Sequence, residues 1–393
     1  MHPSILAALV LVALPSTPVQ GEELRGLWVI RTALASPADV DRVVDQAAEG
    51  GFNTLFVQVR GRGEAFYQSR LVARSEALRG QPADFDPLGR LLARARRSGL
   101  AVHAWLNTLL AAHLPLGLPE GHVLARHPEW AMVPRTVARE ALLAEPGALL
   151  SLIRDESRRV GDIEGFYLSP AQEGVRLHLE EVVRELVASY PVDGVHLDFI
   201  RYPGPEFDYS RAALEAFRVG RGDRTGELLE GPTADPAGWA AFRRDTLTRL
   251  ADRLCRAARE ARPGICLSAA VAPDEAQALH HKFQDWPRWL LTGVLDAVCP
   301  MVYTEDTRLF RRQVERARGR VGPRVWIGVG SYQLPVETTI EQIRVAREAG
   351  AAGVVLFSHE SFGPRELARL RREVFPQPGG AGAAAGSLKA PGQ

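Results

Sequence analysis

The chain has 393 residues, of which 46% are hydrophobic and 24% charged, a composition typical of a globular protein with a sizeable core. Its formal net charge of +1 argues against a nucleic-acid partner, because a polyanion calls for a cationic surface. The three cysteines are an odd number and fall on one predicted helix and two predicted strands, which favours free thiols over a disulfide framework.

The first predicted element is a short apolar run at residues 4–14, followed by a break at Pro15. The run suits the core of a signal peptide and is too short to span a bilayer. We therefore expect a signal peptide at 1–21, a mature protein that begins near Glu22, and a secreted or periplasmic location. The alternatives are a misassigned start and an N-terminal anchor. No later stretch is long and apolar enough for stable membrane insertion.

After this run the chain alternates between the two-residue period of strands and the 3.6-residue period of helices. Strands are predicted at 24–30, 54–59, 101–107, 195–200, 265–271, 297–303, 325–330 and 354–358. Helices are predicted at 37–49, 86–97, 173–189, 239–261, 286–291, 309–317, 340–349 and 365–372. Eight such units predict a single α/β domain, a (β/α)₈ TIM barrel, at 22–374.

The chain is longer than a minimal barrel, and the excess lies mainly in two segments, 108–170, which we expect to be irregular, and 201–236. Each follows a strand and precedes a helix, so both are long βα loops on the catalytic face. The Gly/Ala-rich end of the chain, 375–393, is predicted to be a disordered tail.

The stretch 193–203 carries the strongest chemical signal. Asp198 stands near the end of an apolar strand, and the chain then turns into a loop through Arg201. A carboxylate there is costly to bury without a partner or a task, and the carboxyl ends of barrel strands are where catalysis takes place. The alternative is a structural acid that ties the loop to Arg201.

Other polar residues follow the remaining strands, and their mixture of acids, amides, histidines and aromatics suits a sugar. The candidate substrate-binding residues are Arg60, His103, Trp105, Asn107, His196, Arg201, Tyr303, His359 and Glu360. Each has a structural alternative: His103 and His196 as core histidines, Trp105 as barrel packing, Glu360 as a helix cap and Arg60 as a structural ion pair.

A metal site is a further alternative, since three histidines and Asp198 could converge and support a metal-dependent hydrolase or deacetylase. No His-x-His or His-x-x-x-His spacing supports it, so we expect neither a metal nor another cofactor.

Several motifs in chain order resemble the glycosyl-hydrolase-10-like family of bacterial secreted barrels (GHL10, the former DUF187 group). The motifs are Leu24-Arg25-Gly26-Leu27-Trp28-Val29, the run 51–60, Phe85-Asp86-Pro87-Leu88, His103-Ala104-Trp105-Leu106-Asn107, the run 193–198, Arg201-Tyr202-Pro203 and Cys299-Pro300-Met301-Val302-Tyr303. The resemblance implies a TIM barrel and glycoside hydrolase activity, and some members resemble enzymes that cut peptidoglycan glycan strands. Many members carry a second acid directly after the matching Asp, where this chain has Phe199.

We therefore predict a glycoside hydrolase that cleaves a bacterial glycan, possibly peptidoglycan strands. Such cleavage needs two carboxyl groups, one on each side of the bond. Asp198 is predicted to be the nucleophile or stabiliser, kept ionised by Arg201, and Asp274 or Glu305 the partner. The alternative is a carbohydrate-binding barrel that lacks the acid pair and is not catalytic.

Overall fold

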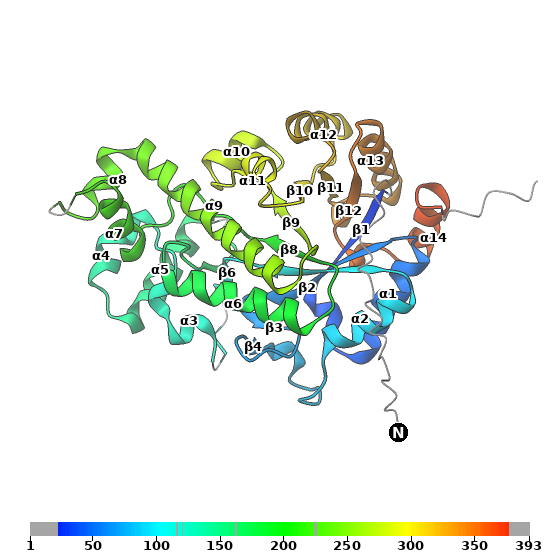
Figure 1. The fold of residues 1–393 in the computed structure, drawn as a ribbon, viewed down its shortest axis with the longest axis horizontal. Coiled ribbons are helices and arrows are strands. Elements are labelled where there is room, and N and C mark those ends of the chain that lie inside the picture. Colours follow the sequence, from blue (N-terminus) through cyan, green and yellow to red (C-terminus); the bar gives the residue numbers. More distant parts are fainter. Residues whose placement is uncertain (1–22, 115–116, 120, 162, 224–225, 377–393) are drawn as a thin grey trace, which may run out of the picture.

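The computed structural model describes residues 23–376 except 115–116, 120, 162 and 224–225. Eight parallel strands form a closed barrel, because β1 pairs with both β2 and β12 (Figure 1). The strands are β1 (Leu24–Val29), β2 (Thr54–Gly61), β5 (Ala101–Asn107), β8 (Gly194–Asp198), β9 (Cys266–Val271), β10 (Ala297–Val302), β11 (Trp326–Val329) and β12 (Gly353–Leu356). All eight coincide with predicted strands, and the TIM barrel is confirmed.

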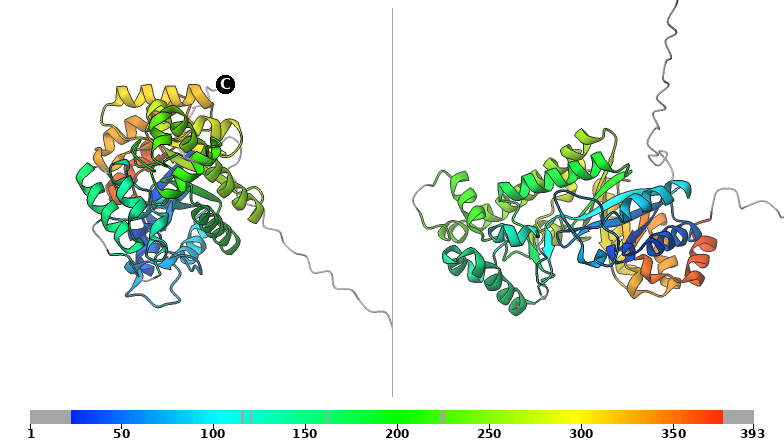
Figure 2. Two further views of the ribbon diagram at one scale, coloured as in Figure 1. Left: turned by 90° about the vertical axis from the view of Figure 1, so that its left-hand side faces the viewer. Right: turned by 90° about the horizontal axis from the view of Figure 1, so that it is seen from below.

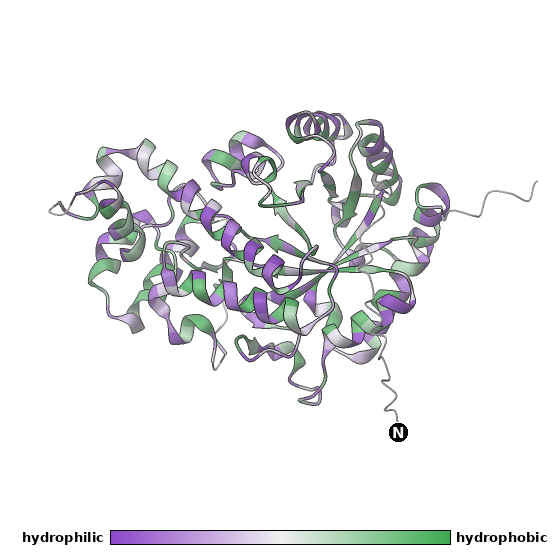
Figure 3. Cartoon of the chain, in the orientation of Figure 1, coloured by the Kyte–Doolittle hydropathy of each residue, from purple (hydrophilic) through white to green (hydrophobic). Residues whose placement is uncertain are grey.

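Helices cover the outside of the barrel and bury one apolar face each. The covering helices are α1 (Pro37–Glu49), α2 (Pro87–Arg97), α6 (Glu173–Ser189), α9 (Pro236–Ala261), α11 (Trp286–Leu291), α12 (Thr307–Val321), α13 (Val336–Glu348) and α14 (Pro364–Glu373). In α1, the Ser36 side chain accepts a hydrogen bond from the Asp39 amide, and Val40, Val43, Val44 and Ala47 are buried. Figure 3 shows the result as helices with mixed green and purple faces around a green barrel.

The first long βα segment is not irregular, which corrects the expectation from its sequence. It holds β6 (Leu110–Ala112), α3 (Val123–Arg126), α4 (Ala138–Leu143), α5 (Pro146–Val160) and β7 (Phe166–Tyr167). The second long βα segment holds α7 (Arg211–Gly220) and α8 (Glu230–Ala234). In the first segment, α3 and α4 have only 4 and 6 residues, too few for a helical period to stand out in the sequence, whereas the period of the 15-residue α5 was overlooked. Together the two segments form a helical lobe beside the barrel (Figures 1 and 2).

The lobe is anchored to the ends of two barrel strands. The Thr108 amide donates to the Asp198 carbonyl at 2.7 Å, and the Leu168 amide donates to the Leu109 carbonyl at 2.8 Å. β6 and β7 pair antiparallel, so the segment that precedes β7 returns to the carboxyl ends of β5 and β8. The lobe can therefore supply side chains to the barrel mouth.

The predicted signal peptide and nearly all of the predicted tail lie outside the described residues. Within the part that the structure describes, no helix has the length and apolar character needed to cross a membrane. Cys255, Cys266 and Cys299 are all free thiols, as expected. Phe375, which the sequence placed in the tail, is buried and contacts Phe52 with ring centroids 5.3 Å apart.

Candidate active site

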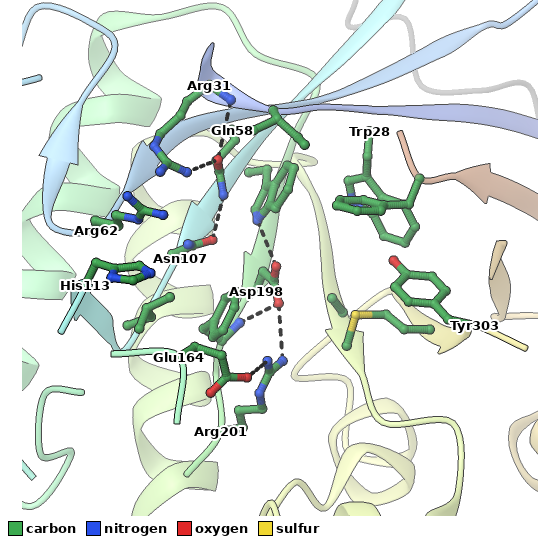
Figure 4. Close-up of a pocket in the computed structure, with 17 residues that line it drawn as sticks. Trp28, Arg31, Gln58, Arg62, Asn107, His113, Glu164, Asp198, Arg201 and Tyr303 are labelled. Atoms are coloured by element: carbon green, nitrogen blue, oxygen red, sulfur yellow. Dashed lines mark hydrogen bonds and ion pairs between the residues drawn. The ribbon is translucent and has the colours of Figure 1, made fainter. Parts of the chain in front are cut away.

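A cavity of about 530 Å³ opens at the carboxyl ends of the barrel strands. Its size falls in the range of ligand pockets, and its position is where TIM barrels carry their active sites. Its lining comes from every barrel strand or strand end except β11, including Trp28 in β1, Asp198 at the end of β8 and Tyr303 after β10 (Figure 4). The lobe contributes Leu110, His113 and Glu164.

Asp198 lies on the floor of this cavity and is 6% exposed. Its Oδ2 accepts a hydrogen bond from Trp105 Nε1 at 3.1 Å, and its Oδ1 accepts one from the Phe199 amide at 2.6 Å. Phe199 has a φ of +49°, an uncommon conformation for a residue with a side chain, which turns the chain sharply after the strand. Burial raises the pKa of Asp198 above its usual value, although Arg201 and the two hydrogen bonds oppose this.

Arg201 connects Asp198 to a second carboxylate, Glu164. Arg201 Nη1 lies 3.6 Å from Asp198 Oδ1, and Nη2 lies 3.2 Å from Glu164 Oε1. The Phe199 ring supports the guanidinium, whose central carbon lies 4.1 Å from the ring centroid. Phe199, the residue directly after Asp198, is thus the aromatic residue that orients Arg201.

Glu164 comes from the lobe, just before β7, and sequence reasoning missed it. Tyr167 donates a hydrogen bond from its hydroxyl to Glu164 Oε2 at 2.8 Å. Burial acts to raise the pKa of Glu164, but the charge of Arg201 and the Tyr167 hydrogen bond outweigh it, and the pKa lies below its usual value. The pKa values of the two carboxyl groups in the cavity are therefore shifted in opposite directions, upward for Asp198 and downward for Glu164.

Gly165 explains how Glu164 reaches the cavity. A Cβ at this position would lie 1.9 Å from the Ala112 carbonyl oxygen, so only glycine allows the close approach of the chain to β6. The one signal for this site in the sequence is Glu164-Gly165 placed before the apolar pair Phe166-Tyr167. It is a weak signal unless the pairing of β6 with β7 is known.

One wall of the cavity is aromatic. The Trp28 and Tyr303 rings are edge to face with centroids 6.5 Å apart, and the Tyr303 and Phe357 rings stack at 5.7 Å. Such faces suit the apolar face of a sugar ring. Trp105 also lines the cavity, and its hydrogen bond to Asp198 gives it a role beyond barrel packing.

The opposite wall is polar and begins with a chain of hydrogen bonds. Arg31 Nη1 donates to Gln58 Oε1 at 2.8 Å, and Gln58 Nε2 donates to Asn107 Oδ1 at 3.1 Å. Arg62 and His113 continue this wall (Figure 4). Asn107 was predicted from the sequence, whereas Arg31, Arg62 and His113 were not among the candidates.

His103 and His196 lie inside the barrel below the cavity. Burial lowers the pKa of His103 to about 4 and, together with the charge of His103, that of His196 to about 3. His196 Nδ1 lies 2.9 Å from Ser268 Oγ, and its Nε2 accepts from Trp28 Nε1 at 3.3 Å. These contacts fit core histidines that support Trp28 from below.

Arg60 is fully buried on the outer side of the barrel wall, against Leu179, Val183 and Leu254 of α6 and α9. The register of β2 on β5 shifts between Gln58 and Arg60, and this β-bulge reverses the side to which Arg60 points. The structure therefore does not bring Arg60 to the cavity.

Four other candidates do not line the cavity either. Asp274 caps α10 (Glu275–His280) by accepting from the Gln277 amide at 2.9 Å, and its other oxygen pairs with Arg316 at 3.1 Å. Glu305 is exposed between β10 and α12. His359 and Glu360 lie in the turn that follows β12, where Glu360 accepts from Thr32 Oγ1 at 3.5 Å.

In the described ranges, no group of three or more His, Cys, Asp and Glu side chains is arranged to hold a metal ion. The four residues of the metal alternative, His103, His196, Asp198 and His359, are accordingly not assembled into one ligand set.

Comparisons with known proteins show the family of this chain. The family model of glycosyl hydrolase-like 10 matches residues 23–341. Glycosyl hydrolase DigH of Escherichia coli (strain K12) is 24% identical over 370 residues, which cover 83% of this chain and 77% of DigH. Glycosyl hydrolase YngK of Bacillus subtilis (strain 168) is 23% identical over 319 residues, which cover 72% of this chain and 54% of YngK.

Among solved structures, the glycoside hydrolase domain of PgaB (BpsB) from Bordetella bronchiseptica superposes with a TM-score of 0.67 at 15% identity, covering 91% of this chain and 100% of that domain. At this identity the similarity shows the shared fold. The family match extends over most of the chain, so the protein belongs to the glycosyl hydrolase-like 10 family and is a TIM-barrel enzyme of the glycoside hydrolase class.

Proposed function

We propose that the protein cleaves a bacterial glycan with Asp198 and Glu164 as its two carboxyl groups. The observation that carries the proposal is Arg201, which contacts both carboxylates at the floor of one cavity. Glycosidic cleavage needs two such groups with different protonation states. Neither Asp274 nor Glu305, the partners expected from sequence, lines this cavity.

The pKa directions favour Asp198 as the general acid and Glu164 as the base or nucleophile. A carboxyl group whose pKa is raised by burial holds its proton to higher pH and so suits donation to the leaving glycosidic oxygen, whereas one whose pKa is lowered stays ionised to lower pH. This reverses the role predicted for Asp198 from the sequence, which took Arg201 as the dominant neighbour, whereas the effect of burial outweighs that of Arg201. Once Asp198 has lost its proton, Trp105 Nε1 and the Phe199 amide stabilise the carboxylate.

The expected substrate is an exported glycan, with peptidoglycan strands as the leading candidate. Support comes from the apolar run at 4–14, which suits export, and from the nearly neutral chain, which argues against a densely charged polyanion. The aromatic wall at Trp28, Tyr303 and Phe357 would hold a sugar ring beside Asp198.

The test is incubation of the protein with bacterial glycan strands stripped of peptide, read by the release of reducing ends. Asp198→Asn serves as the inactive control, and a storage polysaccharide as the competing substrate. We expect reducing ends from the glycan strands with wild type alone. Turnover of the storage polysaccharide with none of the wall glycan would contradict the substrate but leave the hydrolase in place.

A further inference from the structure

The catalytic cavity has an aromatic side at Trp28 and Tyr303 and a positively charged side at Arg31 and Arg62. The positively charged side has no role in the acid and base chemistry proposed above. Arg31 follows β1, Arg62 follows β2, and His113 follows β6. These three side chains line the catalytic cavity and also a second cavity of about 240 Å³, so they form the boundary between the two. Figure 4 shows them on the side of Asp198 away from Trp28 and Tyr303.

The polar groups at this boundary are not fully used by the protein. Among the described residues, no carboxylate forms an ion pair with Arg62, and His113 Nδ1 is buried without a hydrogen-bond partner. Burial and the positive charge of Arg62 lower the pKa of Arg31 to about 10, so both guanidinium groups remain charged and repel each other. An anion placed between them would relieve this repulsion and accept charge-assisted hydrogen bonds.

The charges around this boundary match a single negative charge. Glu64, which lines the second cavity, is the acid that acts on Arg31, and its Oε2 accepts from Ser75 Oγ at 2.6 Å. Burial and the two arginines lower the pKa of His113, which is then neutral at pH 7. Among the described lining residues of the second cavity that form no ion pair within the protein, two guanidinium groups and one carboxylate leave one net positive charge, which a carboxylate neutralises and a phosphate dianion would exceed.

The remaining titratable side chains that line the second cavity, Glu76 and His122, already have partners within the protein. Glu76 forms an ion pair with Arg79, and His122 Nε2 lies 3.0 Å from the Arg62 carbonyl and 2.9 Å from that of Ala111. Burial lowers the pKa of His122 as well, so it adds no charge at pH 7.

We propose that Arg31, Arg62 and His113 form a subsite for a sugar residue that carries a carboxylate, on the far side of Asp198 from the aromatic wall. The proposal rests on the glycan substrate proposed above and narrows it to an acidic glycan, such as one with lactyl or uronic carboxylates. The chain would then bind a sugar face at Trp28 and Tyr303 and an acidic sugar at Arg62, with the reacting bond between them.

The test measures binding, so that it does not depend on turnover. In the Asp198→Asn background, the Kd for peptide-free wall oligosaccharides is compared with the Kd for the same oligosaccharides after their carboxylates are converted to amides. We expect the acidic form to bind at least about tenfold more tightly, the gain of one charge-assisted pair. Arg62→Gln should bring the ratio close to one, and Arg62→Lys should restore part of it.

Arg97→Gln is the matched control, because it removes the same charge from the exposed face of α2 and should leave the ratio unchanged. Equal Kd values for the two forms, or an unchanged ratio in Arg62→Gln, would overturn the subsite. A preference for the acidic form in a protein whose wild type releases no reducing ends would instead uphold the subsite and contradict the proposed hydrolysis.

Discussion

At the scale of single residues, the chemistry of Asp198 is set by what surrounds it. Its carboxyl group is buried, so the charged form is disfavoured, while the Trp105 indole and the Phe199 amide favour it. Glu164 differs because Arg201 lies closer to it, at 3.2 Å against 3.6 Å from Asp198, and because Tyr167 also donates a hydrogen bond to it, so its pKa is lowered despite burial. Two carboxyl groups of similar intrinsic acidity are thereby suited to opposite tasks.

These shifts predict a bell-shaped dependence of kcat/KM on pH, with Glu164 setting the acidic limb and Asp198 the alkaline limb. Activity should be lost as pH falls through the pKa of Glu164, which lies below 4.5, and as pH rises through the pKa of Asp198, which lies above 3.8. Trp105→Phe removes a hydrogen bond that favours ionised Asp198, so the alkaline limb should move to higher pH. Trp326→Phe is the control for lost side-chain volume, because Trp326 packs inside the barrel against Phe56 and forms no hydrogen bond with Asp198. This control should leave the alkaline limb in place. A shift to lower pH in Trp105→Phe would contradict the assignment of Asp198 as the acid.

At the scale of elements, the site depends on the pairing of β6 and β7, which positions Glu164. Gly165 stands so close to the Ala112 carbonyl that an added methyl group would push the two strands apart. The second carboxylate is therefore held by a backbone contact in the lobe rather than by a barrel strand.

Gly165→Ala should accordingly reduce kcat strongly, by about 10²-fold or more, because small displacements of a catalytic group are costly. Gly147→Ala is the matched control: it lies in α5 of the same segment, and its added Cβ would meet nothing within 4 Å. We expect that control to keep kcat and to raise the thermal stability slightly. Unchanged kcat in Gly165→Ala, with a melting temperature equal to that of wild type, would show that the β6–β7 contact does not position the site.

At the scale of the whole molecule, the barrel could be predicted from the sequence because its signals are local. Alternating strands, proline-led helices such as α1, and glycines at helix ends each act within a few residues. The position of Asp198 followed from the same rule, since a polar residue at the end of a barrel strand faces the mouth.

The remainder of the site could not be predicted, because it depends on contacts between distant segments. Glu164 and Arg201 are 37 residues apart in the sequence, and the antiparallel pairing of β6 with β7 inside the lobe brings them together. The prediction that Arg60 faces the cavity was wrong, because a single bulge in β2 changes the face to which every later residue of the strand points. Asp198 is the last residue of β8, whereas Asp274 and Glu305 come three residues after β9 and β10, and their loops place them at the N-terminal cap of α10 and on the surface.

The central claim is that Asp198 and Glu164 are the catalytic pair, and the kcat of four variants on peptide-free glycan strands tests it most directly. Asp198→Asn and Glu164→Gln should each lower kcat by about 10²- to 10⁴-fold, while Asp274→Asn and Glu305→Gln should remain within a few-fold of wild type. Circular dichroism and melting temperature establish that each variant is folded. A folded Glu164→Gln with wild-type kcat, together with loss of activity in Asp274→Asn or Glu305→Gln, would contradict the account.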